Sequence, residues 1–348
     1  MRTRLRLLFL LALVTLSVAL PSRVASAQPP DAGAAADDPW GFEDEEQVET
    51  WSDILAPQWV DIGLTSALIV LALVSFNRRS RPLKYATLAF TLGYMGFTKS
   101  TMISVTDIFR VVDSGKAVLA IPSADLSMAA VGSAAASAFP DFKYSISWYI
   151  FAGFTVLSTL VWGRLYCGRI CAWGAFTHWL DAVLPKSLRK DPPVWLERRA
   201  NNVKYGLLGA VIVYYLATHH VNVYRYVEPF WMFTWTATPL LWAMLVALVL
   251  VTVVVRNAYC RFLCPVGAAL GLIAQVTTLL PIKRWAECKT CKICERTCDW
   301  GAIQGPKIVK RECVRCDDCE RVYADKDACV HWLIIVKKER WAREGIKA

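Results

Sequence analysis

Five apolar stretches dominate the first 284 residues of this chain and restrict what it can fold into. Each is long enough, or nearly so, to cross a hydrocarbon core of ~30 Å as a helix. They lie at Trp59–Phe76, Tyr85–Val105, Ile146–Trp162, Val203–Ala217 and Pro239–Val255. With 55% hydrophobic residues, the chain is too apolar for an ordinary soluble enzyme. We therefore expect an all-α helical membrane protein with about five transmembrane helices.

The N-terminal region has the organisation of a secretory signal peptide. Three arginines precede the apolar run Leu7–Leu20, and Ala25-Ser26-Ala27 supplies small residues for cleavage. An uncleaved membrane anchor is the alternative interpretation of residues 1–27. Residues 28–57, which follow, are acidic and rich in Ala, Pro and Asp, a composition typical of disordered segments.

The distribution of basic residues predicts the orientation in the membrane. No Lys or Arg occurs between Arg23 and Arg78, whereas ten acidic residues do, so this segment is expected in the periplasm. Basic residues follow the first apolar stretch and also separate the third from the fourth, which places both connections in the cytoplasm. The net charge of +10 is then mostly a matter of topology, and nucleic acid is not an expected partner. Five crossings leave the C-terminus on the cytoplasmic side.

Eight cysteines fall within 42 residues near the C-terminus. They form two runs that both begin C-x2-C-x2-C, a spacing that wraps three thiolates round one corner of an iron–sulfur cube. In two-cluster ferredoxins the fourth cysteine of one run ligates the cluster of the other run. We therefore expect one [4Fe–4S] cluster on Cys288, Cys291, Cys294 and Cys329, and a second on Cys313, Cys316, Cys319 and Cys298.

Structural zinc is the alternative for these cysteines, since it also uses paired C-x2-C ligands. A run of three cysteines at this spacing favours the cube. Asp299 and Val330 follow the fourth cysteines where ferredoxins commonly have proline. The chain thus divides into a signal (1–27), an acidic periplasmic segment (28–57), a transmembrane core (58–284), an α+β two-cluster ferredoxin-like domain (285–335) and a basic tail (336–348).

An internal repeat is the second chemical signal. The pattern Y-C-x3-C-x2-G-A begins at Tyr166 and again at Tyr259, and every element is displaced by 93 residues. The four cysteines of the repeat are Cys167, Cys171, Cys260 and Cys264. Positions four apart share one face of a helix, so each pair is expected to present its two sulfurs together. These thiols either bind a further metal or cluster, or connect to the ferredoxin domain, or simply pack in the interior.

Arginines accompany both copies of the repeat: Arg164 and Arg169 in the first, Arg256 and Arg261 in the second. The positive-inside rule alone accounts for them. Glu228 lies in a short connection expected on the outer side, where a carboxylate close to the membrane suggests a function.

The residues from about 145 to 335 resemble the membrane iron–sulfur proteins of the NosR/NirI type, which are associated with nitrous oxide and nitrite respiration. The resemblance rests on the two C-x3-C motifs, on Val227-Glu228-Pro229-Phe230, and on the spacing of the eight C-terminal cysteines with Val322-Tyr323 between the last two. NapH-type quinol dehydrogenases and copper-reducing assembly factors share the general plan. In this chain Ala172 replaces the proline that usually follows the first motif. NosR-type proteins also carry a periplasmic flavin-binding domain, for which only about thirty residues are present here.

The resemblance implies an inner-membrane electron-transfer protein that supports a periplasmic reductase such as nitrous oxide reductase. Its electron donor would be the quinone pool or a cytoplasmic protein, and a partner flavoprotein would supply any flavin. Quinol dehydrogenation is one candidate activity, and a maturation or regulatory role is the alternative. All predicted clusters lie on the inner side, and ~30 Å of hydrocarbon is too far for one electron hop. A quinone, a flavin partner or a further cofactor is therefore expected to carry the charge across.

Overall fold

The computed structural model describes residues 57–119, 146–185, 188–190, 192, 194–235, 238–282, 291, 293–304 and 307–344. The expected signal peptide, most of the acidic segment that follows it, and Cys288 lie outside these residues. Within the described part, residues from Gln58 onward form one compact unit.

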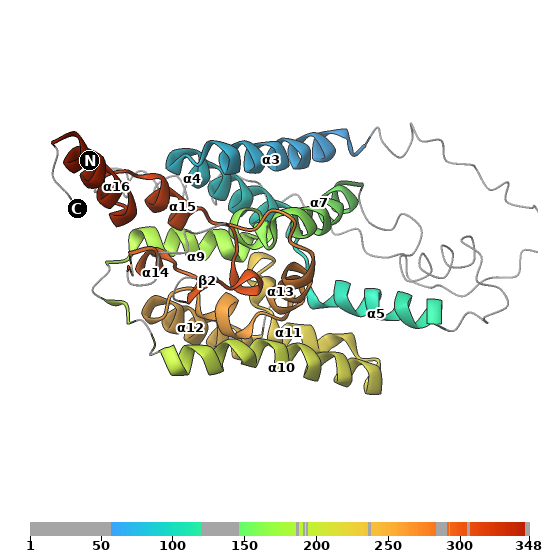
Figure 1. Ribbon diagram of the computed structural model, residues 1–348. Coiled ribbons are helices and arrows are strands. Elements are labelled where there is room, and N and C mark those ends of the chain that lie inside the picture. Colours follow the sequence, from blue (N-terminus) through green and yellow to red (C-terminus); the bar gives the residue numbers. More distant parts are fainter. Residues whose placement is uncertain are drawn as a thin grey trace, which may run out of the picture. The chain divides into compact units, whose positions relative to one another are not determined.

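The unit is built almost entirely of helices (Figure 1). Its N-terminal helices are α3 (Trp59–Arg78), α4 (Arg81–Phe90), the π-helix η1 (Thr91–Thr98), α5 (Val105–Leu119), α7 (Ile146–Trp162), α8 (Leu165–Arg169), α9 (Ala172–Val183) and α10 (Val194–Thr218). Then come η4 (Val221–Val223), α11 (Tyr224–Val227), η5 (Pro229–Phe233), α12 (Pro239–Val254), the π-helix η6 (Tyr259–Leu263) and α13 (Pro265–Thr277). The C-terminal region comprises α14 (Ile293–Thr297), β1 (Ile303–Gln304), β2 (Lys307–Ile308), η7 (Lys310–Glu312), α15 (Asp318–Ala324) and α16 (Val330–Arg343).

The helices predicted at Ile146–Trp162 and Pro239–Val255 are found as α7 and α12, and that predicted at Trp59–Phe76 is found as α3. By length and composition, α3 is the one helix among the described residues that can cross a membrane by itself. The helices α7, α12 and α13 are apolar but shorter.

Two of the expected stretches have different limits in the structure. The stretch predicted at Tyr85–Val105 is helical only to Thr98, because residues near Ser104 instead form the start of α5. Ser104 Oγ and the backbone N–H of Val105 donate hydrogen bonds of 2.6 and 2.8 Å to the Glu228 carboxylate, which fixes this start. The stretch predicted from Val203 begins nine residues earlier, at Val194. Charged side chains are accommodated in its first turns because Glu197 pairs with Arg261.

The helix α5 belongs to what was expected to be a long connection. It packs on α10 through a parallel stack of Phe109 on Tyr215, with ring centroids 4.1 Å apart and planes within 7°. The small-residue run Met128–Ala138 in the same connection lies outside the described residues.

The C-terminal region contains the expected α+β elements in a small form. The strands β1 and β2 pair antiparallel, with Ile303 opposite Ile308 and Gln304 opposite Lys307. This region shares the apolar core of the helices: Trp300, Val314 and Cys316 pack in the same cluster as Tyr166, Trp173 and Tyr259 of the repeats. The core of the molecule is therefore centred where the two sets of cysteines meet.

Candidate functional site

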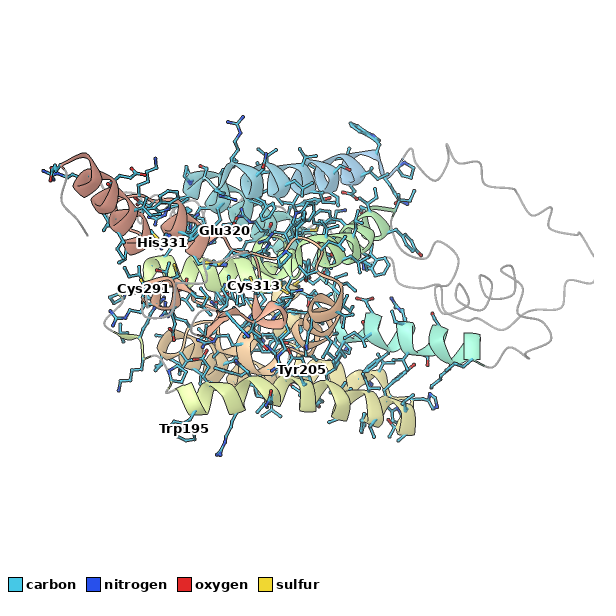
Figure 2. The ribbon with its side chains drawn as sticks, in the orientation of Figure 1. Trp195, Tyr205, Cys291, Cys313, Glu320 and His331 are labelled. Atoms are coloured by element: carbon cyan, nitrogen blue, oxygen red, sulfur yellow. The ribbon has the colours of Figure 1, made fainter. Side chains whose placement is uncertain are left out.

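The described C-terminal cysteines occupy short helices and the turns between them. Cys294 lies in α14 and Cys319 in α15, Cys298 follows α14, Cys313 follows η7, and Cys329 precedes α16. Cys291 and Cys313, one from each run, are labelled in Figure 2. None of the described cysteines is in a disulfide.

The structure brings Cys298 to the second run of cysteines. Burial raises the pKa of Cys313 to about 11, and the nearby Cys298 thiol contributes to the rise. Burial likewise raises the pKa of Cys316 and Cys319, and Cys298 is again among the neighbours responsible. Cys298 therefore lies close enough to the second run to influence its thiols, although it is fifteen residues from Cys313 in sequence.

The loop of the second run has the backbone that such ligation needs. Arg315 and Asp317, which flank Cys316, both have left-handed backbone conformations, with φ of 54° and 64°. This conformation is unfavourable for residues with a Cβ atom, so the surrounding contacts must maintain it. A tight turn is what a C-x2-C-x2-C run needs if its three sulfurs are to ligate one cluster. Within the described residues, however, no group of three or more His, Cys, Asp or Glu side chains is arranged as a metal site.

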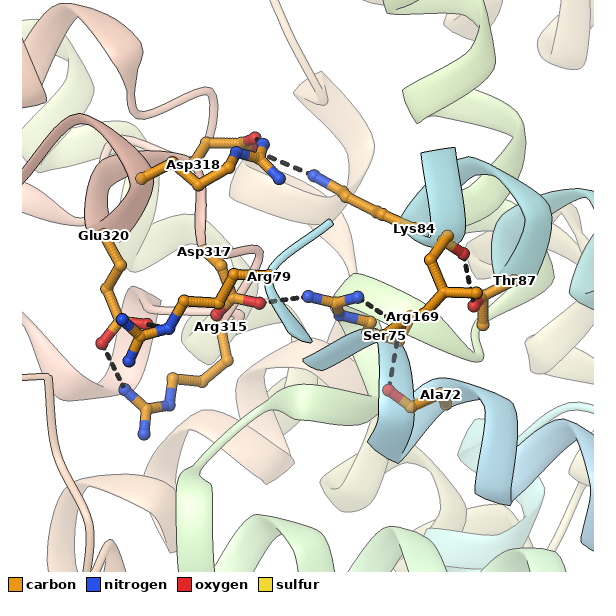
Figure 3. A network of polar contacts seen from close by, with 12 residues as sticks. Ala72, Ser75, Arg79, Lys84, Thr87, Arg169, Arg315, Asp317, Asp318 and Glu320 are labelled. Atoms are coloured by element: carbon orange, nitrogen blue, oxygen red, sulfur yellow. Dashed lines mark hydrogen bonds and ion pairs between the residues drawn. The ribbon is translucent and has the colours of Figure 1, made fainter. Parts of the chain in front are cut away.

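Ion pairs attach this loop and the start of α15 to the helices of the core (Figure 3). The buried Arg169 pairs with Asp317, which is also buried. Lys84 Nζ lies 2.8 Å from Asp318 Oδ2 although only 3% of the lysine is exposed. Glu320 accepts weaker pairs from Arg79 at 3.7 Å and Arg315 at 3.8 Å. Acidic residues beside the candidate ligands therefore pair with basic residues of the core. The positive-inside rule had accounted for those basic residues without any such contact.

A second group of buried charges surrounds Glu312, directly before Cys313. Its carboxylate pairs with Lys204 of α10, accepts a hydrogen bond of 3.0 Å from Tyr205 Oη, and lies 3.8 Å from Arg164 Nη1. Glu312 is 4% exposed and Lys204 is fully buried. Arg164 also donates a 3.0 Å hydrogen bond to the carbonyl oxygen of Arg311. One carboxylate thus joins η7 to two elements of the core.

The four cysteines of the internal repeat line a single cavity, which we call the thiol chamber. It has a volume of about 10 Å³, and its walls include Cys167, Cys171, Cys260, Cys264 and Trp173. Each of the four cysteines is 7–8% exposed. The sequence predicted that the sulfurs within each pair lie together, and the structure brings the two pairs together as well.

The pairs do not lie on continuous helices as expected. Cys167 is in α8 and Cys260 in η6, but Cys171 and Cys264 are the residues that cap the N-termini of α9 and α13. The helix is interrupted between the two members because each second cysteine has an extended backbone, with ψ of 122° and 112°. The sulfurs meet because the chain turns there, not because they share a helical face.

The glycine of each repeat permits this close packing. A Cβ atom on Gly174 would lie within 3.0 Å of the carbonyl oxygen of Cys167. A Cβ atom on Gly267 would lie 2.7 Å from Arg164 Nη2 and 3.4 Å from Cys264 Sγ. The recurring glycine is therefore required at both copies by contact with the first cysteine's backbone or with the arginine beside the chamber.

Sequence reasoning missed two components of this region. Arg164 and Arg169 are each 1% exposed and connect the repeats to the C-terminal loop, whereas the positive-inside rule left them without a role. Their position beside the cysteines was the available signal. Ile103 and Phe230 also line the chamber. No local pattern identifies them, since they come from connections far from the cysteines in sequence.

Family comparisons agree with this division into repeats and C-terminal region. A family model described as a 4Fe-4S binding domain matches twice, at residues 144–191 and 236–284, and each match contains one C-x3-C pair. A model described as NosR matches residues 286–340. A regulatory protein NosR from Pseudomonas aeruginosa is 35% identical over 72 residues, which is 72% of its length and 20% of this chain. The chain belongs to the NosR/NirI family.

Longer members of the NosR/NirI family extend the similarity to most of the chain. Another regulatory protein NosR from Pseudomonas aeruginosa is 29% identical over 294 residues, covering 78% of this chain and 38% of the relative. Protein NirI from Paracoccus denitrificans is 27% identical over 339 residues, covering 89% of this chain and 44% of the relative. The chain therefore spans less than half the length of these two relatives. No solved structure matches it significantly.

Proposed function

We propose that this NosR/NirI-type protein is an iron–sulfur electron carrier of the inner membrane. It relays electrons between a cytoplasmic or quinol donor and a periplasmic acceptor, and it supports nitrous oxide reductase in denitrification-type respiration. The observation that carries the proposal is the loop with Cys313, Cys316 and Cys319, which ion pairs between buried side chains anchor on the helical core and whose thiols Cys298 lies close enough to influence.

The donor set fits a [4Fe–4S] cluster. Sulfur is the ligand that iron–sulfur clusters take, and the four thiols come from the two runs in the pattern of two-cluster ferredoxins. Cys291, Cys294 and Cys329 would hold the other cluster together with Cys288. When bound, each cluster accepts and releases one electron.

The protein's own residues fix where the second cluster would stand. Arg169, Lys84 and Arg164 hold the acidic residues on either side of the ligand loop. Cys316 is 7% exposed, and the other three proposed ligands of this cluster are half-buried. A site partly shielded from water limits the reorganisation of solvent and protein that accompanies a change of charge.

The membrane arrangement is part of the proposal. Apolar helices α3, α7 and α12, together with α10 and the continuous pair α4 and η1, correspond to the five crossings. The basic residues then put the ligand loop on the cytoplasmic side and the α5 and α11 connections on the periplasmic side. A separate flavoprotein or the quinone pool would exchange electrons with the chain.

Anaerobic purification and spectroscopy test the cluster assignment. Dithionite-reduced protein should give the electron paramagnetic resonance spectrum of two interacting [4Fe–4S]⁺ centres. Cys316→Ser should remove one centre, and Cys294→Ser should remove the other, which would separate the two ligand sets. Protein that contains zinc and no iron would contradict the proposal.

Regulation is the second candidate function, since the NosR relatives carry the description "regulatory protein". Deletion of the gene distinguishes the two roles. Loss of reductase turnover with unchanged reductase transcript supports electron delivery. Regulation is supported instead if the reductase transcript falls on deletion and if expression of the reductase from another promoter restores turnover.

A further inference from the structure

We propose that the thiol chamber binds a third iron centre through the four sulfurs of the internal repeat. This centre is additional to the two clusters of the C-terminal region and does not depend on them. The proposal starts from geometry: Cys167 and Cys171 from one repeat and Cys260 and Cys264 from the other line one enclosed space.

The number and type of donor atoms suit a tetrahedral metal site, which the four side chains would complete by closing round the metal, because they are not arranged as a metal site in the structure described. Four thiolates in two pairs suit either iron in an iron–sulfur or mononuclear site, or zinc. None of the four cysteines forms a disulfide, so all four sulfurs are available as ligands. The four sulfurs line a cavity of only about 10 Å³, so as thiolates they would repel one another, and a cation between them would relieve that repulsion.

Positively polarised groups face the chamber sulfurs, although the Glu228 carboxylate is also near enough to Cys264 to oppose them. The helices α9 and α13 both begin at chamber cysteines, so the positive ends of two helix dipoles meet there. The Gly267 N–H donates a 3.2 Å hydrogen bond to Cys264 Sγ, and Arg164 Nη2 lies 4.0 Å from Cys167 Sγ. These donors lower the free energy of thiolates, the form that binds metal.

A wall residue offers an independent indication of an occupant. Trp173 lines the chamber, is 1% exposed, and its indole N–H has no acceptor among the residues that the structure describes. Leaving such a donor unpaired costs about 1–3 kcal/mol. The sulfide or thiolate sulfurs of a bound centre are acceptors of the kind that is missing.

The chamber touches the C-terminal ligand loop on one side. A Cβ atom on Gly168 would lie within 3.0 Å of the carbonyl oxygen of Val314, so these two backbones are in direct contact. Gly168 follows Cys167, and Val314 follows Cys313. A centre in the chamber and a cluster on the second run are thus separated by one layer of polypeptide.

The opposite wall comes from connections that the charge pattern assigns to the outer side. Ile103 and Phe230 line the chamber. The Ile103 N–H donates a 3.2 Å hydrogen bond to Tyr166 Oη, beside Cys167, while Glu228 binds Ser104 and Val105. The chamber therefore lies between the ligand loop and the segments expected to face the periplasm.

Iron is the metal that this position and the family comparison favour. The 4Fe-4S binding model matches the two segments that contain the chamber cysteines, and it matches none of the eight C-terminal cysteines. Zinc would satisfy the same four sulfurs but has no redox chemistry.

Metal analysis of the whole wild-type protein tests the proposal without any variant. Protein purified anaerobically from ⁵⁷Fe-grown cells should contain iron in excess of two cubes, and Mössbauer spectroscopy should resolve a third component. The amount of excess iron gives the nuclearity of the centre. Iron equal to two cubes, or zinc in place of the excess, would overturn the proposal.

Variants locate the third component. Replacement of one cysteine from each repeat, Cys167→Ser with Cys260→Ser, should abolish it and leave both C-terminal centres in the spectrum. The matched control Ile103→Val changes the same wall without removing a donor and should retain the full iron content. Cys316→Ser should show the reverse pattern, with the third component intact. Loss of the third component in Cys316→Ser but not in the double variant would refute the chamber as its site. If wild-type protein shows the third component but neither C-terminal centre, only the proposed function is refuted.

Discussion

The buried carboxylate of Glu312 gives a sharp test of how the C-terminal region is held. In Glu312→Gln the shape of the side chain and a hydrogen bond to Tyr205 are kept, but the negative charge is lost. Lys204, which is fully buried, and Arg164, which is 1% exposed, then remain as cations without their carboxylate. Removing one partner of a buried ion pair costs about 3–5 kcal/mol, because the remaining charge is left uncompensated in a poorly polar environment.

We expect the lower end of this range, about 3 kcal/mol, because Arg164 keeps its hydrogen bond to the Arg311 carbonyl oxygen. Since ~1.4 kcal/mol corresponds to a tenfold change in an equilibrium constant, the fraction of molecules with η7 detached should rise roughly 150-fold. Proteolysis under native conditions measures this fraction, because cleavage of a transiently opened segment follows its population when reclosing is fast. The assay is the rate of cleavage after η7 in protein reconstituted in lipid nanodiscs under anaerobic conditions.

An exposed ion pair in the same region supplies the control. Arg340 and Glu344 lie 2.9 Å apart, with 73% and 45% of their side chains exposed. Such pairs contribute about 0–1 kcal/mol, so Glu344→Gln should change the cleavage rate little. Adding Lys204→Met to Glu312→Gln should recover part of the loss, because it removes one of the unpaired cations. A cleavage rate for Glu312→Gln no higher than that of Glu344→Gln would refute the reasoning.

Three further perturbations follow from the described contacts. Gly168→Ala should accelerate cleavage of the C-terminal region and weaken the spectrum of the second cluster, because the added Cβ atom would collide with the Val314 carbonyl oxygen. The control Gly153→Ala, whose Cβ atom would have no neighbour within 4 Å, should leave both unchanged. Phe109→Ala should lower the free energy of unfolding by about 3–5 kcal/mol in a denaturant titration, while Val111→Ala, 61% exposed, should not. Burial raises the pKa of Glu228 from 4.5 to about 8, so the folded protein holds this proton more tightly than the unfolded chain and stability should fall as pH rises between these values. Glu228→Gln should flatten that dependence in thermal unfolding scans, and an equal pH slope in the two proteins would contradict the assignment.

Local patterns were enough to predict several of the apolar helices. The apolar runs gave α7 with both limits correct and α12 to within one residue, because length and hydrophobicity act on each segment independently. The start of α10 was wrong because Glu197 is paired with Arg261 far along the chain, and a scan for apolar runs treats such a charge as the end of a helix. The assignment of ligands to the two clusters stays a prediction.

The meeting of the two repeats could not be read from the sequence. The period of 93 residues showed that both copies have the same local structure, but not that their cysteines share one space. That arrangement depends on the close approach of Arg164 to Gly267 and on the backbone contact of Gly168 with Val314. Both contacts join segments that are far apart in the sequence. For the same reason the arginines seemed to need no role beyond topology.

The shortness of α9 bears on how charge could pass through an insulating layer. From Ala172 to Val183 the helix has 12 residues and an axis of roughly 18 Å. That axis is shorter than a layer ~30 Å thick, so α9 would enter the layer without crossing it if its C-terminal end meets the basic segment assigned to the inner surface. A metal at Cys171 would then stand inside the layer, and an electron halting there would have less distance left to the outer surface than one that starts from the ligand loop.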